Sequence, residues 1–321
     1  GADYVAASFV RTASNVRSVI AFLDGCVADA VPSAGQSKNR LRPLVISKIE
    51  SAEGVANFME ILAESDGIMV ARGDLGVEIP YSQVFAAQKE MVAACNAVGK
   101  PVIVATQMLD SMQRNPRPTR AEVTDVGTAV LDGADAVMLS GETAAGKYPI
   151  ESIRAMRSVL KEADRIVTSK GPPKNNLFVE TLKSTNNILD AELDTVAFAA
   201  VRGAADLPAK LIVVITMTGK SARYIARHRP TVPVLAFCTD AQVARRLQLH
   251  RCITPIMLQS TLDPDDPSTS MSKLRAEALR TAKQLGFVRA GERVVTVDRT
   301  RGKAHDLHHY SHNVKVATLR E

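Results

Sequence analysis

The sequence predicts an α/β protein built around parallel sheets. Short apolar runs rich in β-branched residues alternate along the chain with longer stretches of helical pattern, and Gly or Pro flanks several of them. Two of these runs end in charged residues: Lys48 and Glu50 at the end of the first, and Asp74 at the end of the second. In an α/β barrel the C-terminal ends of the strands carry the chemistry, so these residues indicate a metal and anion site rather than packing.

Five strands are expected in the first half of the chain, each ended by small or polar residues and followed by a helix. Their ends lie at residues 8–11, 48–50, 72–74, 106–107 and 140–142. A helix expected at about 150–167 is interrupted by a segment that contains Gly171, Pro172 and Pro173. We therefore expect a first domain over residues 1–170, a linker at 171–177 and a second domain over 178–321.

The alternation continues in the second half. An Ala-rich helix at 195–205 precedes a strand at 211–215, and a helix opens at residues 219–221. The remaining expected elements are strands at 234–237, 253–258, 293–297 and 314–318 and a helix at about 271–285. This order predicts a three-layer α/β/α domain, with the polar segments 32–42 and 259–272 as surface loops.

Composition excludes several classes of protein. Of 321 residues, 46% are hydrophobic and 23% are charged, and no apolar run approaches the ~18 residues of a membrane span. The net charge is +6, but the basic residues are dispersed, which argues against nucleic-acid binding. The four cysteines lack metal or disulfide spacing, which favours a reducing, cytoplasmic setting. The chain starts at Gly1 just before a strand pattern, so we expect its N-terminus to be incomplete.

Five motifs follow one another in the first half of the chain, four of them at strand ends. They are ISKIE (46–50), IMVARGDLG (68–76), ATQML (105–109), RPTRAE (117–122) and MLSGET (138–143). In their order and spacing these motifs resemble the pyruvate kinase family. The resemblance implies the C-terminal five strands of a TIM (β/α)8 barrel, followed by a regulatory α/β domain. It begins at what would be the fourth strand, so the first three strands and the lid domain inserted after them are expected to be missing.

The resemblance implies transfer of a phosphoryl group from phosphoenolpyruvate to ADP, giving pyruvate and ATP, the final step of glycolysis. Phosphoryl transfer needs positioning and charge neutralisation more than covalent catalysis, which suits a cation facing a metal. The implied cofactors are Mg²⁺ or Mn²⁺, and K⁺ with ligands outside this chain. A cytoplasmic homo-oligomer, a tetramer, is implied, and the isolated chain is expected to be inactive.

Three residues form the implied metal and phosphoryl site. By resemblance, Glu50 and Asp74 are the carboxylates on the metal, and Lys48 lies against the migrating phosphoryl group. The alternatives are that the two acids form surface salt bridges and that Lys48 is a structural partner of Glu50.

Substrate contacts and proton transfer are implied for the neighbouring strand ends. The implied substrate-binding residues are Lys48, Arg72, Gly73, Asp74 and Thr106. Thr106 resembles the threonine beside the enolate carbon, and Ser140 the hydroxyl that joins it through water, so the implied catalytic residues are Lys48, Thr106 and Ser140. The alternative is that these hydroxyls cap helices or bond to backbone.

The segment around Pro118 has the form of a helix start. Thr119 is a plausible cap, with Glu122 three residues later. The family also has a subunit contact near this segment, so a local and a functional role are both open.

In the second domain, a polar segment follows a strand and opens a helix, where amides and hydroxyls could cradle a phosphate. It resembles the family's loop for a sugar-phosphate effector. The implied effector-binding residues are Thr216, Thr218, Gly219, Lys220, Ser221, Arg299 and Arg301. An unoccupied strand-to-helix turn is the alternative. Four histidines at 305, 308, 309 and 312 indicate a solvated or effector-side loop rather than a metal site.

Two other functions stay open. The chain could be a non-enzymatic fragment whose C-terminal domain binds a phosphorylated effector. It could also be another magnesium-dependent barrel enzyme acting on pyruvate-like substrates, such as an aldolase or mutase. Formation of pyruvate that depends on ADP distinguishes these, since an aldolase would ignore ADP.

Overall fold

The computed structural model describes residues 1–29, 42–171, 188–260, 270–301 and 310–319. They form two compact units, Gly1–Arg165 and Ile166–Glu321. The boundary falls within helix α8 (Pro149–Lys170), which continues three residues beyond its expected end. Of the expected linker, only Gly171 is described, and most of the two expected surface loops also lies outside the described residues.

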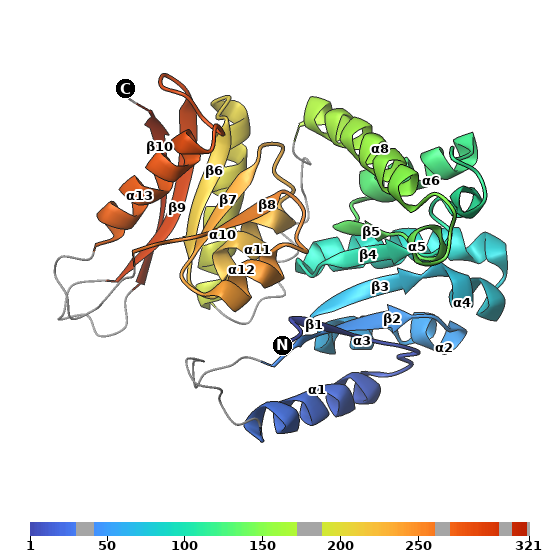
Figure 1. The fold of residues 1–321 in the computed structure, drawn as a ribbon. Helices are drawn as coiled ribbons and strands as arrows, with labels where there is room; N and C mark the ends of the chain where they lie inside the picture. The colour runs from blue at the N-terminus through green and yellow to red at the C-terminus, as the bar shows by residue number, and fades with distance from the viewer. Residues whose placement is uncertain (30–41, 172–187, 261–269, 302–309, 320–321) are drawn as a thin grey trace. The chain divides into compact units, whose positions relative to one another are not determined.

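The first unit is built on five parallel strands that are neighbours in chain order (Figure 1). They are β1 (Tyr4–Ala7), β2 (Leu44–Ile49), β3 (Gly67–Ala71), β4 (Val102–Ala105) and β5 (Ala136–Met138). Consecutive parallel strands joined by right-handed crossovers place their helices on one face of the sheet, as in a barrel. The prediction of five strands is confirmed.

One apolar core joins this sheet to its helices. The helices before α8 are α1 (Ala13–Ala28), α2 (Ala52–Ala56), α3 (Phe58–Glu64), α4 (Arg72–Glu78), α5 (Tyr81–Val98), η1 (Asp110–Gln113), α6 (Arg120–Asp132) and α7 (Gly141–Ala144). On β2, Val45 and Ile49 are fully buried in this core. Side chains alternate along a strand, so Lys48 projects from the opposite face.

The second unit is a mixed sheet in the order β10-β9-β6-β7-β8. Its strands are β6 (Leu211–Thr216), β7 (Val234–Cys238), β8 (Ile253–Met257), β9 (Arg293–Arg301) and β10 (Tyr310–Thr318). Only the β9–β10 pair is antiparallel. These two strands are longer than expected because they pair with each other along their whole length.

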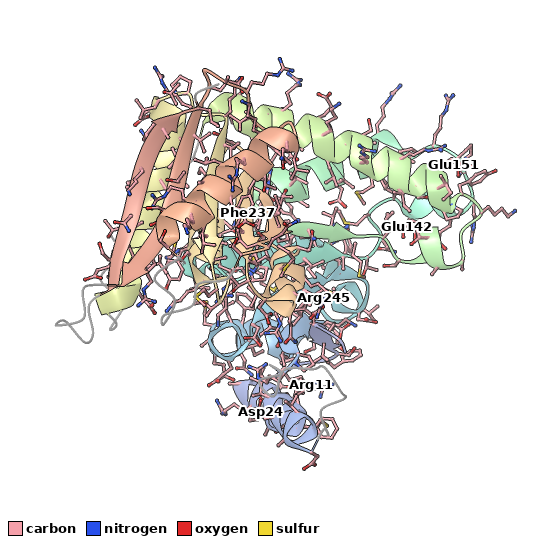
Figure 2. All side chains as sticks on the ribbon, turned by 60° about the vertical axis from the view of Figure 1, so that its left-hand side comes forward. Arg11, Asp24, Glu142, Glu151, Phe237 and Arg245 are labelled. Carbon is pink, nitrogen blue, oxygen red and sulfur yellow. The ribbon has the colours of Figure 1, made fainter. Side chains whose placement is uncertain are left out.

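Helices cover both faces of this second sheet (Figure 1). They are α10 (Ile188–Asp206), α11 (Lys220–Arg227), α12 (Ala241–Leu247) and α13 (Met271–Gln284). One core packs α10, α11 and α12 against residues such as Ile212 and Val214, and a second packs α13 against Val213 and Phe237 (labelled in Figure 2). The three-layer prediction is confirmed. No described helix is long and apolar enough to span a membrane.

Candidate active site

The carboxyl end of β2 carries a buried acid with a cation beside it. Glu50 is 1% exposed, and its Oε1 lies 2.8 Å from Lys48 Nζ. Its Oε2 accepts a hydrogen bond of 2.6 Å from the backbone N–H of Phe9, and Lys48 Nζ also donates to Ser8 Oγ at 3.0 Å. The structure therefore contains the ion pair that was the simpler interpretation of these two residues. It also fixes the ammonium group at a strand end, where a phosphoryl-binding role requires it.

The second candidate metal ligand lies at the end of the adjacent strand. Asp74 is in the first turn of α4, is exposed, and makes no hydrogen bond or ion pair with any other described residue. Because β2 and β3 pair in parallel, with Ile49 opposite Val70, their carboxyl ends share one edge of the sheet. Two carboxylates that leave room for water and substrate oxygens fit Mg²⁺. Within the described residues, no three His, Cys, Asp or Glu side chains gather into a metal site.

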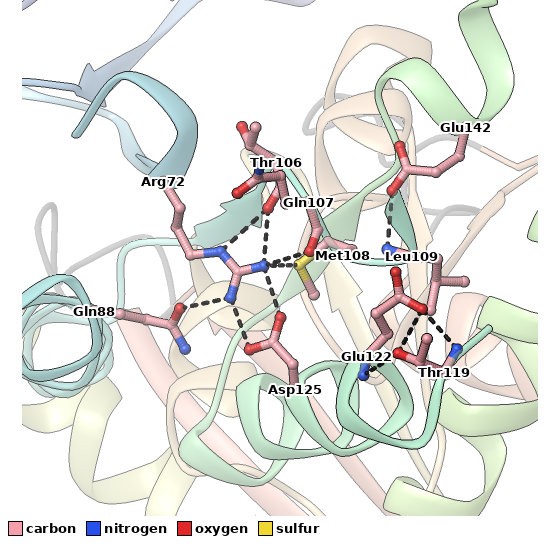
Figure 3. Close-up of polar contacts among 10 residues, drawn as sticks. All are labelled: Arg72, Gln88, Thr106, Gln107, Met108, Leu109, Thr119, Glu122, Asp125 and Glu142. Carbon is pink, nitrogen blue, oxygen red and sulfur yellow. Dashed lines mark hydrogen bonds and ion pairs between the residues drawn. The ribbon is translucent and has the colours of Figure 1, made fainter. Parts of the chain in front are cut away.

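Arg72 is the centre of a polar network at the ends of β3 and β4 (Figure 3). Its guanidinium binds Asp125 through two contacts of 2.8 and 2.7 Å, and donates to Gln88 Oε1 at 3.3 Å. It also donates twice to the carbonyl of Thr106, at 3.2 and 2.8 Å, and once to that of Gln107 at 3.4 Å. The side chain is 12% exposed. Its donors are directed to protein acceptors, which makes it a brace for the following loop.

The loop that Arg72 holds has an unusual backbone. Thr106 and Gln107 have φ values of 76° and 55°, in the left-handed region. Such a conformation costs residues other than glycine about 1–3 kcal/mol and persists only where surrounding contacts enforce it. The hydrogen bonds from Arg72 to both carbonyls provide such contacts. They place Thr106 next to Gly73, where an added Cβ would lie 2.7 Å from Thr106 Cγ2.

Ser140 lies at the start of α7, after β5. It occupies the N-cap position, but its hydroxyl makes no capping hydrogen bond. Its backbone N–H instead donates to Glu142 Oε2 at 2.8 Å. The helix-capping alternative for the Ser140 hydroxyl is therefore wrong.

The helix start at α6 has the expected capping box. Thr119 Oγ1 accepts from the N–H of Glu122, and the Glu122 carboxylate accepts from the backbone and hydroxyl of both Thr119 and Ser111 at 2.7–2.8 Å. Burial favours the protonated acid, but these hydrogen bonds to the charged form outweigh it and lower the pKa of Glu122.

We expect Glu122→Gln to lower the free energy of unfolding by about 1–2 kcal/mol at neutral pH, as for other lost caps. A folded-state pKa below the unfolded value gives stability that is present above the unfolded pKa and lost as pH falls through the folded one. Urea unfolding at neutral and acidic pH should show the gap between the two proteins closing on acidification. A gap that stays constant with pH would contradict this. Glu162→Gln, at an exposed position of α8, is the control.

In the candidate effector loop of the second unit, the lysine is already paired with an acid of the same unit. Gly219, with φ 77°, precedes α11, and Lys220 at the first position of that helix forms an ion pair with Asp190 of α10. Thr216 is buried, Thr218 Oγ1 accepts from the Lys220 N–H, and Arg299 is exposed. The Arg301 side chain and the histidines at 305, 308 and 309 lie outside the described part of the chain.

His312 is the one histidine of that late group that the structure describes. Burial lowers its pKa, and the positive charges of Arg299 and Lys220 lower it further. The lowered pKa leaves the His312 imidazole neutral at physiological pH.

Several residues of these networks were not predicted from the sequence. Gln88, Asp125 and Asp190 carried no motif signal, and Glu142 was part of a motif but was given no role. A polar residue on the buried side of α5 is the one signal that could have identified Gln88, which is 3% exposed.

The fold and the strand ends define a class of protein. The first unit is part of an α/β barrel with a Lys–Glu pair and a second carboxylate at the C-terminal edge of its sheet, and the second is a three-layer α/β domain. Residues 1–153 match the family model described as pyruvate kinase, barrel domain, and residues 194–307 match that of pyruvate kinase, alpha/beta domain. The chain belongs to the pyruvate kinase family.

Curated relatives agree with this assignment. A pyruvate kinase of Agaricus bisporus is 42% identical over 304 residues, which cover 94% of this chain and 54% of the relative. One of Dictyostelium discoideum is 44% identical over 296 residues, 92% of this chain and 54% of the relative. Human pyruvate kinase PKLR is 42% identical over 299 residues, which cover 92% of this chain and 48% of the relative. The chain thus spans about half the length of the relatives it matches.

Proposed function

We propose that this chain carries phosphoryl-transfer machinery of a pyruvate kinase, which converts phosphoenolpyruvate and ADP to pyruvate and ATP. The observation that supports this most is the Lys48–Glu50 pair at the end of β2. At the end of the adjacent strand β3 lies Asp74, whose carboxylate has no partner among the described residues. Phosphoryl transfer is accelerated mainly by fixed charges that meet the charge developing on the phosphoryl oxygens. An ammonium held by two protein partners needs little reorganisation to do this.

Glu50 and Asp74 would hold the Mg²⁺ or Mn²⁺ ion. When bound, the ion would neutralise charge on substrate oxygens. Lys48 would remain next to Glu50 and contribute its positive charge to the same group. Arg72 contributes indirectly in this proposal, because its donors brace the Thr106 loop, while the backbone of Gly73 and Asp74 meets the substrate carboxylate.

The hydroxyls of Thr106 and Ser140 would serve the second half of the reaction, in which the enolate of pyruvate takes a proton on carbon. Thr106 is held in its left-handed conformation by Arg72, and the Ser140 hydroxyl is not used as a helix cap. Both are therefore available to a hydroxyl and water relay.

The test is pyruvate release from phosphoenolpyruvate and ADP with Mg²⁺ and K⁺. The 321-residue chain is assayed beside a chimera in which it replaces the matched segment of the Agaricus bisporus relative. ADP-dependent pyruvate formation in either protein supports the proposal. A folded chimera that forms no pyruvate contradicts it, and pyruvate formation that ignores ADP favours the aldolase or mutase alternative.

Glu50→Gln should raise the Mg²⁺ concentration needed for half-maximal activity by about tenfold or more, because an amide oxygen is a weaker ligand for a hard cation than a carboxylate. A Mg²⁺ titration of the active protein measures this. Glu162→Gln, which alters an exposed acid on α8 that pairs with Arg165, is the control. An unchanged titration in Glu50→Gln would remove Glu50 from the ligand set.

A second candidate function is effector binding by the C-terminal unit, through Gly219 and Lys220 with the other residues of the loop. The observation in its favour is the backbone turn at Gly219 followed by a lysine at the first position of α11. Isothermal titration with a sugar phosphate should show binding that Lys220→Ala abolishes. The resemblance also supports a homo-oligomer, a tetramer, with K⁺ as a second cofactor and with domains divided by a linker at 171–177.

A further inference from the structure

The carboxylate of Glu142 joins the loops that follow two neighbouring strands. Its Oε1 accepts a hydrogen bond of 2.9 Å from the N–H of Leu109, after β4, and its Oε2 accepts one of 2.8 Å from the N–H of Ser140, after β5 (Figure 3 shows the first). Glu142 is 1% exposed, and it forms no ion pair with any described cation. A charge buried with two backbone amides as its partners is expensive unless both hydrogen bonds are kept.

The two loops are also closely packed around this carboxylate. Leu109 and Met112 are fully buried, and the N–H of Lys147 donates to the carbonyl of Gln113 at 2.9 Å. An added Cβ on Gly141 would lie 2.8 Å from the Gln113 side chain. The loops therefore form one interlocked body, with Glu142 inside it.

This body carries both hydroxyls that the proposed function uses. Thr106 is three residues before Leu109 and is held from its other side by Arg72. Ser140 donates its own N–H to Glu142. We infer that Glu142 is a positioning residue that holds Thr106 and Ser140 in fixed relation to each other, an inference that rests on the proposed function. It acts through the backbone of the two loops.

The arrangement requires a carboxylate of this length. Each oxygen of Glu142 receives one N–H, so a glutamine would satisfy one amide and place its own NH₂ group against the other. Aspartate is one methylene shorter and would not reach both donors. Glu142→Gln is therefore nearly isosteric and still removes one of the two connections.

The first arm of the test follows amide hydrogen exchange in the 321-residue chain. In Glu142→Gln we expect the amides of Leu109 and Ser140 to exchange about tenfold faster or more, while protection in the rest of the sheet is kept. Glu162→Gln, in an exposed pair with Arg165, is the matched control. Unchanged protection at both amides, or a loss of protection throughout the unit, would overturn the inference.

The second arm follows exchange of the methyl protons of pyruvate with deuterated water, with Mg²⁺ present, in whichever of the chain or the chimera is active. We expect Glu142→Gln to slow this exchange about tenfold, with the Mg²⁺ midpoint unchanged, because the metal ligands lie on other strands. If Glu142→Gln weakened Mg²⁺ binding as much as it slowed methyl exchange, the role would be structural only and the inference would be overturned. Absence of exchange in the unsubstituted protein would count against the proposed function, and the first arm then decides whether Glu142 braces the loops.

Discussion

Lys48→Met is expected to lower the turnover number by about 10²–10³-fold, the usual effect of removing one preorganised electrostatic partner of a transition state. Lys48 Nζ is fixed by Glu50 Oε1 at 2.8 Å and Ser8 Oγ at 3.0 Å, so its charge is in place before the substrate arrives. Methionine keeps the length of the side chain and removes the charge. Steady-state kinetics of the active protein measure the change.

Stability needs its own control in this experiment, because Lys48 is also the ion partner of a buried acid. Without it, the Phe9 N–H is the one partner of Glu50 left within the described part of the chain, and we expect a loss of about 1–3 kcal/mol in the free energy of unfolding. Lys89→Met is the control variant. Lys89 on α5 forms an ion pair of 2.5 Å with Asp132 on α6, so this variant also removes a lysine from an ion pair. It should cost less stability, because this pair is more exposed than Lys48–Glu50, and it should leave turnover almost unchanged. Near-normal turnover in a folded Lys48→Met protein would exclude Lys48 from catalysis.

Gly73→Ala should lower turnover by about 10²-fold while the fold is retained, since small displacements of a positioned group have effects of this size. The new Cβ would lie 2.7 Å from Thr106 Cγ2. Rotation of Thr106 about χ1 would relieve the contact, but the same rotation moves its hydroxyl. Displacement of the loop instead would break the carbonyl contacts with Arg72. Either response moves the hydroxyl that the proposed function requires.

Gly76→Ala is the control for Gly73→Ala. It lies in the same helix, α4, and its added Cβ would meet only Val84 Cγ2 at an ordinary 3.9 Å. Alanine is preferred to glycine within a helix by about 1 kcal/mol, so both variants should fold, and Gly76→Ala should keep full turnover. Comparable activity in the two variants would contradict the proposed role of the Gly73–Thr106 contact.

The sequence alone predicted most of the fold, because the patterns that form strands and helices are local. The five strand ends, the α6 capping box and the Gly219 turn all follow from neighbouring residues. Three elements were predicted too short. Helix α8 continues to Lys170, and strands β9 and β10 extend further along each other than expected. β9 and β10 are consecutive strands, and their antiparallel pairing lengthens both in a way that neither strand's sequence shows by itself.

The candidate site divides in the same way. Lys48, Glu50 and Asp74 stand in short motifs at strand ends, so the sequence could propose them together. Which groups hold that site in place depends on tertiary structure. Arg72 meets Asp125 from 53 residues away, and Glu142 meets Leu109 from 33. Hydrogen bonds over such separations form only after the strands have packed. The donor reaches its acceptor through folding of the whole unit, and a local sequence pattern cannot predict that contact.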